Sequence, residues 1–144
     1  MNYMKLKPIT INEIKYIAHS LAKETMDWNE PIPEFNTRYP NKLESCIITP
    51  FQTFGKKLLF RGLIEKAAIL FYLMIKDHPF QNGNKRIAVT ALLVFLFING
   101  HWLKMDAQTL YNRALWVASS PPDAKNEAVK YIEKFVRTSI VKKN

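Results

Sequence analysis

The segment 78–86, with the sequence His-Pro-Phe-Gln-Asn-Gly-Asn-Lys-Arg, combines the side chains of this chain that are best suited to chemistry on a phosphate. It lies between the two most apolar stretches of the sequence, so it must connect two buried helices. A loop that contains a histidine, two asparagines, a glycine and two cations does not serve packing. Its composition predicts a binding site for an anionic group, and a nucleotide phosphate is the candidate ligand.

The helix that follows Gly83 supplies the backbone part of such a site. The first turn of a helix offers N–H groups without intrahelical partners and the positive end of the helix dipole. Gly83 allows the backbone to approach a phosphate closely. Lys85 and Arg86 in this turn are each unfavourable by a few tenths to about 1 kcal/mol unless an anion compensates the dipole. We therefore expect a phosphate at the start of this helix.

His78 is the candidate base of the segment. Histidine side chains ordinarily titrate at roughly pH 6.5, so an imidazole at this position can accept the proton of a hydroxyl nucleophile at neutral pH. Phe80 would fix the loop in the core. A polar residue that ends a helix is the simpler interpretation of an isolated histidine before proline, and a solvated pair is the alternative for Lys85 and Arg86. Their combination in one segment favours chemistry.

Two central helices must position this loop. Apolar residues cover most of the circumference of the segment 61–77, which predicts a helix packed on several sides. This helix should end near His78, because Pro79 disfavours helical geometry in the residue before it. A second buried helix is predicted over 83–99, with Gly100 in the position just beyond its end.

The remaining sequence predicts further helices and one small hairpin. Thr10-Ile11-Asn12-Glu13 is typical of a capping box, and Asp123 is the expected N-cap of the last helix. The segment 50–60 has aromatic and β-tolerant residues around a glycine, which favours a small hairpin, or flap. The further helices are expected at 11–26, 42–48, 106–119 and 123–139. Residues 1–144 should therefore form one all-α domain with a small β-hairpin flap.

The composition limits the classes of partner. With 144 residues, 48% of them hydrophobic, the chain is large enough to bury one core. Twenty-one Lys and Arg residues against twelve Asp and Glu give a net charge of +9, which favours an acidic partner such as a nucleotide, a nucleic acid or an acidic protein. The basic residues are spread along the chain and no recognition-helix pattern is visible, so we expect no direct binding of nucleic acid.

Several features are typical of a cytoplasmic protein. The single cysteine, Cys46, cannot form an intramolecular disulfide, and the N-terminal residues lack the apolar core of a signal peptide. The most apolar run, 87–98, is shorter than the roughly 18 to 20 residues that a membrane-spanning helix requires. We therefore expect no association with a membrane.

The segment 78–86 resembles the signature of the Fic and Doc proteins, His-x-Phe-x-(Asp or Glu)-(Gly or Ala)-Asn-(Gly or Lys)-Arg, and only Asn82 departs from it. The similarity covers most of residues 10–119. It includes the stretches 43–45, 64–68 and 95–100, and the segment 51–60 at the place of the family's target-binding flap. The resemblance implies an all-helical core and the transfer of AMP or phosphate from a nucleotide to a protein hydroxyl.

The resemblance also implies roles for single residues of the signature. His78 would be the base that deprotonates the target hydroxyl. Gly83 and Asn84 would help to form the anion hole, while Lys85 and Arg86 would bind the nucleotide phosphates and assist the transfer. The expected nucleotide is ATP or another nucleoside triphosphate.

A metal and a protein target are implied in the same way. Asn82 occupies the position of the acidic residue that holds Mg²⁺ in the family, so it is the candidate metal ligand, with an amide oxygen in place of a carboxylate. Thr53, Phe54 and Gly55 occupy the flap and would contact the protein substrate.

Two positions distinguish subgroups within the family. AMP-transferring members usually have glycine at the position of Lys85 and a second arginine at the position of Val89, so both differences resemble the Doc (death-on-curing) toxins. The implied activity is phosphorylation, with translation elongation factor Tu as the candidate target. AMP transfer and a degenerate, non-catalytic member are the alternatives. The inhibitory-helix pattern is matched only in part by 20–25, so a separate acidic antitoxin is the expected partner of this +9 chain.

Overall fold

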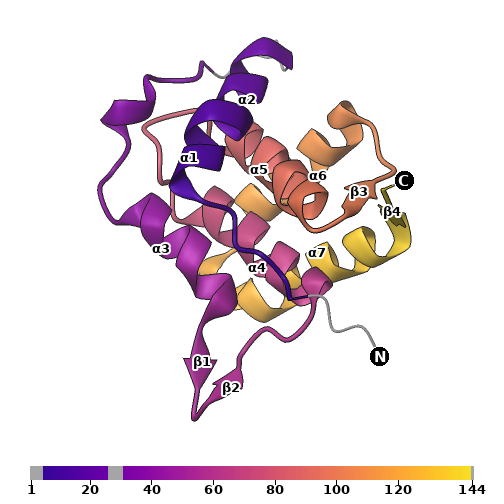
Figure 1. Cartoon of the computed structure of the whole chain (residues 1–144). Coiled ribbons are helices and arrows are strands. Elements are labelled where there is room, and N and C mark those ends of the chain that lie inside the picture. Colours follow the sequence, from indigo (N-terminus) through magenta and orange to yellow (C-terminus); the bar gives the residue numbers. More distant parts are fainter. Residues whose placement is uncertain (1–4, 26–30, 144) are drawn as a thin grey trace.

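Two antiparallel central helices, α4 (Leu63–Lys76) and α5 (Asn84–Ile98), are joined by a short loop, and the segment 78–86 spans this loop and the first residues of α5 (Figure 1). The computed structural model describes residues 5–25 and 31–143. Every residue of α4 from Lys66 to Ile75 is buried. It packs most extensively against α5 and α7, while α6 covers α5. The apolar residues around the circumference of α4 are thus buried against other helices on several sides.

The other elements surround this pair. The remaining helical elements are α1 (Ile11–Glu13), the π-helical turn η1 (Ile14–Ala18), α2 (His19–Thr25), the 3₁₀ turn η2 (Phe35–Thr37), α3 (Lys42–Ile48), the 3₁₀ turn η3 (Thr49–Phe51), α6 (Ala107–Ser119), the 3₁₀ turn η4 (Pro122–Ala124) and α7 (Lys125–Ser139). The strands are β1 (Thr53–Phe54), β2 (Lys57–Leu58), β3 (His101–Leu103) and β4 (Ile140–Lys142). The chain is therefore mostly helical, as predicted.

The N-terminal helical stretch begins with the predicted capping box. The Thr10 side chain accepts a hydrogen bond from the Glu13 backbone N–H at 3.1 Å, and the Glu13 carboxylate accepts one from the Thr10 N–H at 2.9 Å. The stretch continues through η1, where the His19 N–H donates to the Ile14 carbonyl. The last residue of the predicted helix, 26, lies outside the described residues.

The predicted flap is a two-stranded antiparallel hairpin with Thr53 opposite Leu58 and Phe54 opposite Lys57. The two turn residues, 55 and 56, both have positive φ angles, 57° and 68°. This is the type I′ geometry, whose twist matches that of the flanking strands.

A second sheet was not predicted. Strand β3 follows α5 directly and pairs antiparallel with β4, which follows α7. Backbone hydrogen bonds extend the pairing on both sides, from Lys104 N–H to the Ser139 carbonyl at 2.8 Å and from Lys143 N–H to the Gly100 carbonyl at 3.0 Å. The two strands lie far apart in the sequence, so no local pattern signals their pairing.

One predicted N-cap is wrong. Asp123 is not the N-cap of α7, because it lies within η4 and α7 begins only at Lys125. Asp106, by contrast, is the N-cap of α6, and its carboxylate accepts a hydrogen bond from the Thr109 N–H at 2.7 Å. Across the described parts of the chain, none of the helices combines the length and the apolar character that a membrane span requires.

Candidate active site

The loop between α4 and α5 presents His78 at the surface. His78 has a φ angle of 49°, in the left-handed region, and its side chain is exposed. Pro79 and Phe80 turn back into the molecule and are buried, and Phe80 is 1% exposed. A left-handed backbone costs a residue with a β-carbon about 1–2 kcal/mol. The surrounding structure must therefore hold His78 in place.

Asn84 supplies part of that support. Its Oδ1 accepts a hydrogen bond from the Phe80 N–H at 2.9 Å, and its Nδ2 donates to the Phe80 carbonyl at 2.9 Å. The same Nδ2 lies 3.5 Å from Nδ1 of His78. The side chain of Asn84 is 5% exposed, so it braces the loop from inside. Its contribution to an anion hole would therefore come from its backbone N–H.

Gly83 is the N-cap of α5 and has a φ angle of 72°. A Cβ at this position would lie 2.6 Å from Cδ1 of Ile32 and 3.0 Å from the carbonyl oxygen of Pro31. Both the backbone angle and the close approach thus require glycine. The sequence suggested a phosphate as the group that approaches Gly83, whereas in this structure the segment 31–32 lies against this face of it.

Arg86 is directed toward the N-terminal helical stretch. Its guanidinium is buried, and Nη2 donates to the Ala22 carbonyl at 2.5 Å. One turn further along α5, the Thr90 hydroxyl donates to the Ala18 carbonyl at 2.7 Å. Ala22 belongs to the last described turn of α2, where the helix dipole favours a cation. Lys85 lies half-buried in the first turn of α5.

His19 connects α2 to this loop and had no distinguishing signal in the sequence. It is 5% exposed, and its Nε2 lies 2.8 Å from the Pro33 carbonyl oxygen. Its ring also packs on Phe35 and Phe80, with centroid distances of 5.6 Å and 5.8 Å. Burial lowers the pKa of His19, against the opposing effect of the hydrogen bond to Pro33. A neutral His19 therefore helps to seat the loop anchor Phe80.

A cavity of about 380 Å³ opens beside His78. Its size falls within the range of small-ligand sites, about 300–1,000 Å³. The segment before α3 is tied to the loop by a hydrogen bond from the Tyr39 N–H to the Pro79 carbonyl at 2.9 Å. The sequence suggested no functional role for the other residues of this cavity, which are Asn41, Lys42, Ser45, Lys76 and Asp77.

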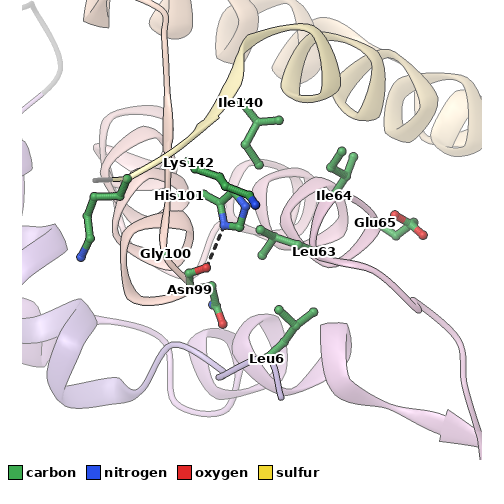
Figure 2. A pocket seen from close by; sticks show the side chains of 10 residues that line it. Leu6, Leu63, Ile64, Glu65, Asn99, Gly100, His101, Ile140 and Lys142 are labelled. Carbon is green, nitrogen blue, oxygen red and sulfur yellow. Dashed lines mark hydrogen bonds between the residues drawn. The ribbon is translucent and has the colours of Figure 1, made fainter. Parts of the chain in front are cut away.

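A larger cavity, of about 660 Å³, lies at the opposite end of α4 and α5 (Figure 2). Leu63, Ile64 and Ile140 give it apolar walls, and His101 points into it with Nδ1 2.8 Å from the Asn99 carbonyl oxygen. It contains none of the signature residues. Size alone therefore does not identify the reactive site of this molecule.

The structure brings the signature residues together, but the hairpin lies away from them. His78, Asn82 and the first turn of α5 share one loop and one helix start. The hairpin precedes α4 and projects from the body, while the loop lies at the other end of that helix (Figure 1). The 14 residues of α4 span about 21 Å at 1.5 Å per residue. Thr53, Phe54 and Gly55 are thus not neighbours of His78.

The residues at the site do not form a metal centre by themselves. The Oδ1 of Asn82, the predicted ligand, accepts a hydrogen bond from the Gly83 N–H at 2.8 Å. Within residues 5–25 and 31–143, no group of three or more His, Cys, Asp or Glu side chains is placed to hold a metal ion. The donor set thus does not fit a Mg²⁺ ion held by this chain alone, since such sites usually include carboxylates.

Comparison with known proteins adds one match. The model of the Fic/DOC family matches residues 8–96, which is more than half of the chain. No curated protein and no solved structure gives a significant match. The matched range includes the N-terminal helical stretch, the hairpin, α4, the signature segment and nearly all of α5, whereas α6, α7 and the second sheet lie beyond it.

Proposed function

The chain belongs to the Fic/Doc family, whose members are generally transferases that modify proteins with nucleotides, and we propose that it transfers part of a nucleoside triphosphate to a hydroxyl group of another protein. One observation carries this proposal. The exposed imidazole of His78 and the start of α5 form a single unit, which Asn84 braces through both backbone groups of Phe80.

In the proposed reaction the target hydroxyl enters the cavity beside His78. The imidazole accepts the hydroxyl proton while the oxygen attacks a phosphorus atom of the nucleotide. The backbone N–H groups at the start of α5 and the cations Lys85 and Arg86 stabilise the charge on the phosphate oxygens. Arg86 has to turn away from the Ala22 carbonyl to do so. The leaving group is the nucleoside diphosphate if phosphate is transferred, and pyrophosphate if AMP is transferred.

Phosphate transfer is the form of the reaction that we propose, as in the Doc toxins. The resemblance of Lys85 and Val89 to that subgroup supports it. Val89 is fully buried in α5, so this position offers no second cation to a nucleotide, unlike the arginine of AMP-transferring members. AMP transfer is the alternative.

The proposed setting is that of a cytoplasmic toxin. Its target would be a protein such as elongation factor Tu, bound in part by Thr53, Phe54 and Gly55 of the hairpin. The net charge of +9 favours association with an acidic antitoxin.

A non-catalytic family member is the second candidate function. Two observations favour it, namely the segment 31–32 against Gly83 and the bond from Arg86 to Ala22. Both occupy groups that a nucleotide phosphate would need.

Radioactive transfer separates these candidates. Purified protein is incubated with a cytosolic extract and ATP labelled at either the γ or the α phosphorus. We expect γ-label on a protein band with the wild type and none with His78→Ala. An α-labelled band would instead identify AMP transfer. If neither label is transferred, the transferase proposal is wrong and binding without catalysis remains.

The same assay tests whether a carboxylate at position 82 would raise the activity. Asn82→Asp restores the carboxylate that the family has at this position. Increased transfer would mean that the amide limits the natural chain, whereas unchanged transfer would mean that a carboxylate at this position is not needed.

A further inference from the structure

We propose that the larger cavity, at the end of α4 and α5 away from His78, is a second binding site, and that its ligand is a small carboxylate with an apolar chain (Figure 2). The chain lies between the aliphatic side chains of the cavity, and the carboxylate pairs with Lys142. This inference goes beyond the proposed function and does not rest on it, because the cavity shares no residue with the signature segment.

Four distant parts of the chain form the walls of this cavity. Leu6 comes from the N-terminal segment, 63–65 from the start of α4, 99–101 from the end of α5 and the beginning of β3, and 140–143 from β4 and the residue after it. The volume of about 660 Å³ lies within the range of small-ligand sites. The cavity is therefore large enough for a chain of several carbon atoms and its charged group.

Asn99 fixes two of these walls to each other. Its side chain is 4% exposed. Its Oδ1 accepts a hydrogen bond from the Lys7 N–H at 2.7 Å, and its Nδ2 donates to the carbonyls of Lys7 at 3.0 Å and Phe95 at 2.9 Å. On another side, the paired strands β3 and β4 form the wall. The fold itself holds these walls in place, so a ligand binds with little cost of reordering.

Aliphatic side chains give the cavity its apolar surface. The four that line it are only partly buried by the rest of the protein, and they are Leu6, Leu63, Ile64 and Ile140. A hydrocarbon chain placed between them removes apolar surface from water on both partners. Each CH₂ group that the cavity takes up should strengthen binding about fourfold.

The basic side chains of the cavity favour an anion at one end of this hydrocarbon chain. The pairing of β3 with β4 places His101 opposite Lys142, and both side chains line the cavity (Figure 2). Within residues 5–25 and 31–143, no carboxylate forms an ion pair with Lys142. Lys143 is directed elsewhere, since its Nζ lies 3.7 Å from the ring centroid of Phe97, which is not part of the lining. An anionic group at Lys142 would gain a charge-assisted hydrogen bond.

His101 and Glu65 complete the polar part of the cavity. Nδ1 of His101 lies 2.8 Å from the Asn99 carbonyl oxygen. A carbonyl oxygen only accepts hydrogen bonds, so Nδ1 carries the proton and Nε2 is the ring nitrogen that remains for a ligand. Among the described residues that line the cavity, Glu65 alone has a carboxylate, and its Oε2 accepts a hydrogen bond from the Gly62 N–H at 3.3 Å. Lys142 therefore selects the charge of the ligand.

Calorimetry with matched probes tests the class of ligand. Decanoate has the apolar chain and the negative charge, decyltrimethylammonium has the chain with the opposite charge, and acetate has the charge without the chain. Below the concentrations at which micelles form, we expect decanoate to bind about tenfold more tightly than either control, or more. Octanoate and hexanoate should bind more weakly, by about fourfold for each CH₂ group that is lost. Equal affinities for decanoate and decyltrimethylammonium would overturn the proposal.

The histidine rings show where decanoate binds. The chain has three histidines, and they lie in separate places: His19 is buried beside Phe80, His78 is exposed at the other end of α4, and His101 lines the cavity. In proton NMR spectra, the ring signals of His101, assigned with His101→Gln, should shift as decanoate is added, while those of His19 and His78 stay in place. A shift of the His78 signals instead would place the anion at the candidate active site and contradict the second site.

Lys142→Met tests the residue that is proposed to hold the carboxylate. It removes the ammonium group from an exposed position and should weaken the binding of decanoate about tenfold or more. Lys104→Met is the matched control, because Lys104 is an exposed lysine that does not line the cavity. Equal weakening by both substitutions would mean that the net charge of the protein, not the cavity, attracts the anion. Urea unfolding confirms that the two variants are folded. None of these measurements uses label transfer, so their outcome is independent of the proposed function.

Discussion

At the scale of single residues, His78 combines an exposed imidazole with a left-handed backbone, at φ 49°. Such conformations persist where the surroundings enforce them, and here the neighbouring loop is held by Asn84. The residue that we propose as the base is therefore also a point of stored backbone strain.

This strain predicts that a glycine variant of His78 is more stable than the alanine variant, which is the reverse of the usual order. Both His78→Ala and His78→Gly should abolish transfer, but the glycine variant should be the more stable of the two by about 1 kcal/mol, because glycine adopts φ > 0 without a steric cost. Urea unfolding of the two variants measures the difference. At an ordinary exposed site alanine is the more stable, and that order would show that the backbone angle carries no strain.

His19 should make stability depend on pH. Its pKa is lowered from 6.5, so below roughly pH 6.5 the unfolded chain takes up a proton that the folded state resists. Stability should be fully present above that pH and decline as the pH falls toward the folded-state pKa. The comparison is urea unfolding between pH 7.5 and 5.5 for the wild type and for His19→Gln, which keeps a donor for Pro33. Parallel curves would mean that His19 is not the group responsible.

Sequence reasoning at this scale proposed the site residues but could not predict how their side chains are oriented. The spacing within 78–86 was enough to predict the candidate base and the candidate phosphate-binding residues. It could not show that the Asn84 amide closes the loop or that Arg86 turns toward Ala22, because both depend on backbone groups whose positions the fold sets. His19 was missed because a lone histidine on an amphipathic helix gives no signal.

At the scale of elements, the segment 31–32 contacts the start of α5, which predicts that substitutions at Gly83 and Ile32 have coupled effects on stability. Gly83→Ala should destabilise the protein by about 2 kcal/mol, from the positive φ and from the clash with Ile32. Adding Ile32→Ala should recover part of this loss, with a coupling of about 0.5–2 kcal/mol.

Gly100→Ala is the matched control for this double-mutant cycle. Gly100 has a φ angle of 80°, but a Cβ there would meet nothing within 4 Å. Its alanine variant therefore reports backbone strain alone and should show no coupling to Ile32→Ala. If denaturant unfolding shows that the losses of stability from Gly83→Ala and Ile32→Ala are additive, the segment 31–32 moves away from the new Cβ without a cost in stability.

The bounds of the two central helices were predicted more closely than the strands and the N-cap of the last helix. The central pair was expected at 61–77 and 83–99 and is observed within two residues of those bounds, because burial on most sides leaves long apolar runs. The β3–β4 pairing joins two three-residue strands from distant parts of the chain, so it has no local pattern. Asp123 was misassigned because Pro122 starts a 3₁₀ turn, which delays the helix.

At the scale of the whole molecule, the net charge of +9 should govern the encounter with a protein target. Attraction between oppositely charged surfaces raises the association rate and is screened by salt. Between about 0.05 and 0.5 M NaCl we expect the rate of label transfer at low extract concentration to fall about tenfold. ATP hydrolysis without target is the comparison that corrects for weaker nucleotide binding. A rate that is unchanged or rises with salt would show that the target is not acidic.

The π-helical turn η1 has a consequence for how related sequences can differ in length. A π turn contains one residue more per hydrogen-bonded ring than an α turn, so loss of one residue within Ile14–Ala18 would leave a regular α-helix. The carbonyls of Ala18, at the end of this turn, and of Ala22, in α2, would keep their orientation relative to the capping box before it. A one-residue gap elsewhere in this helix would rotate those carbonyls by about 100° away from Thr90 and Arg86. Relatives with a shorter N-terminal helix should therefore have their gap at this turn.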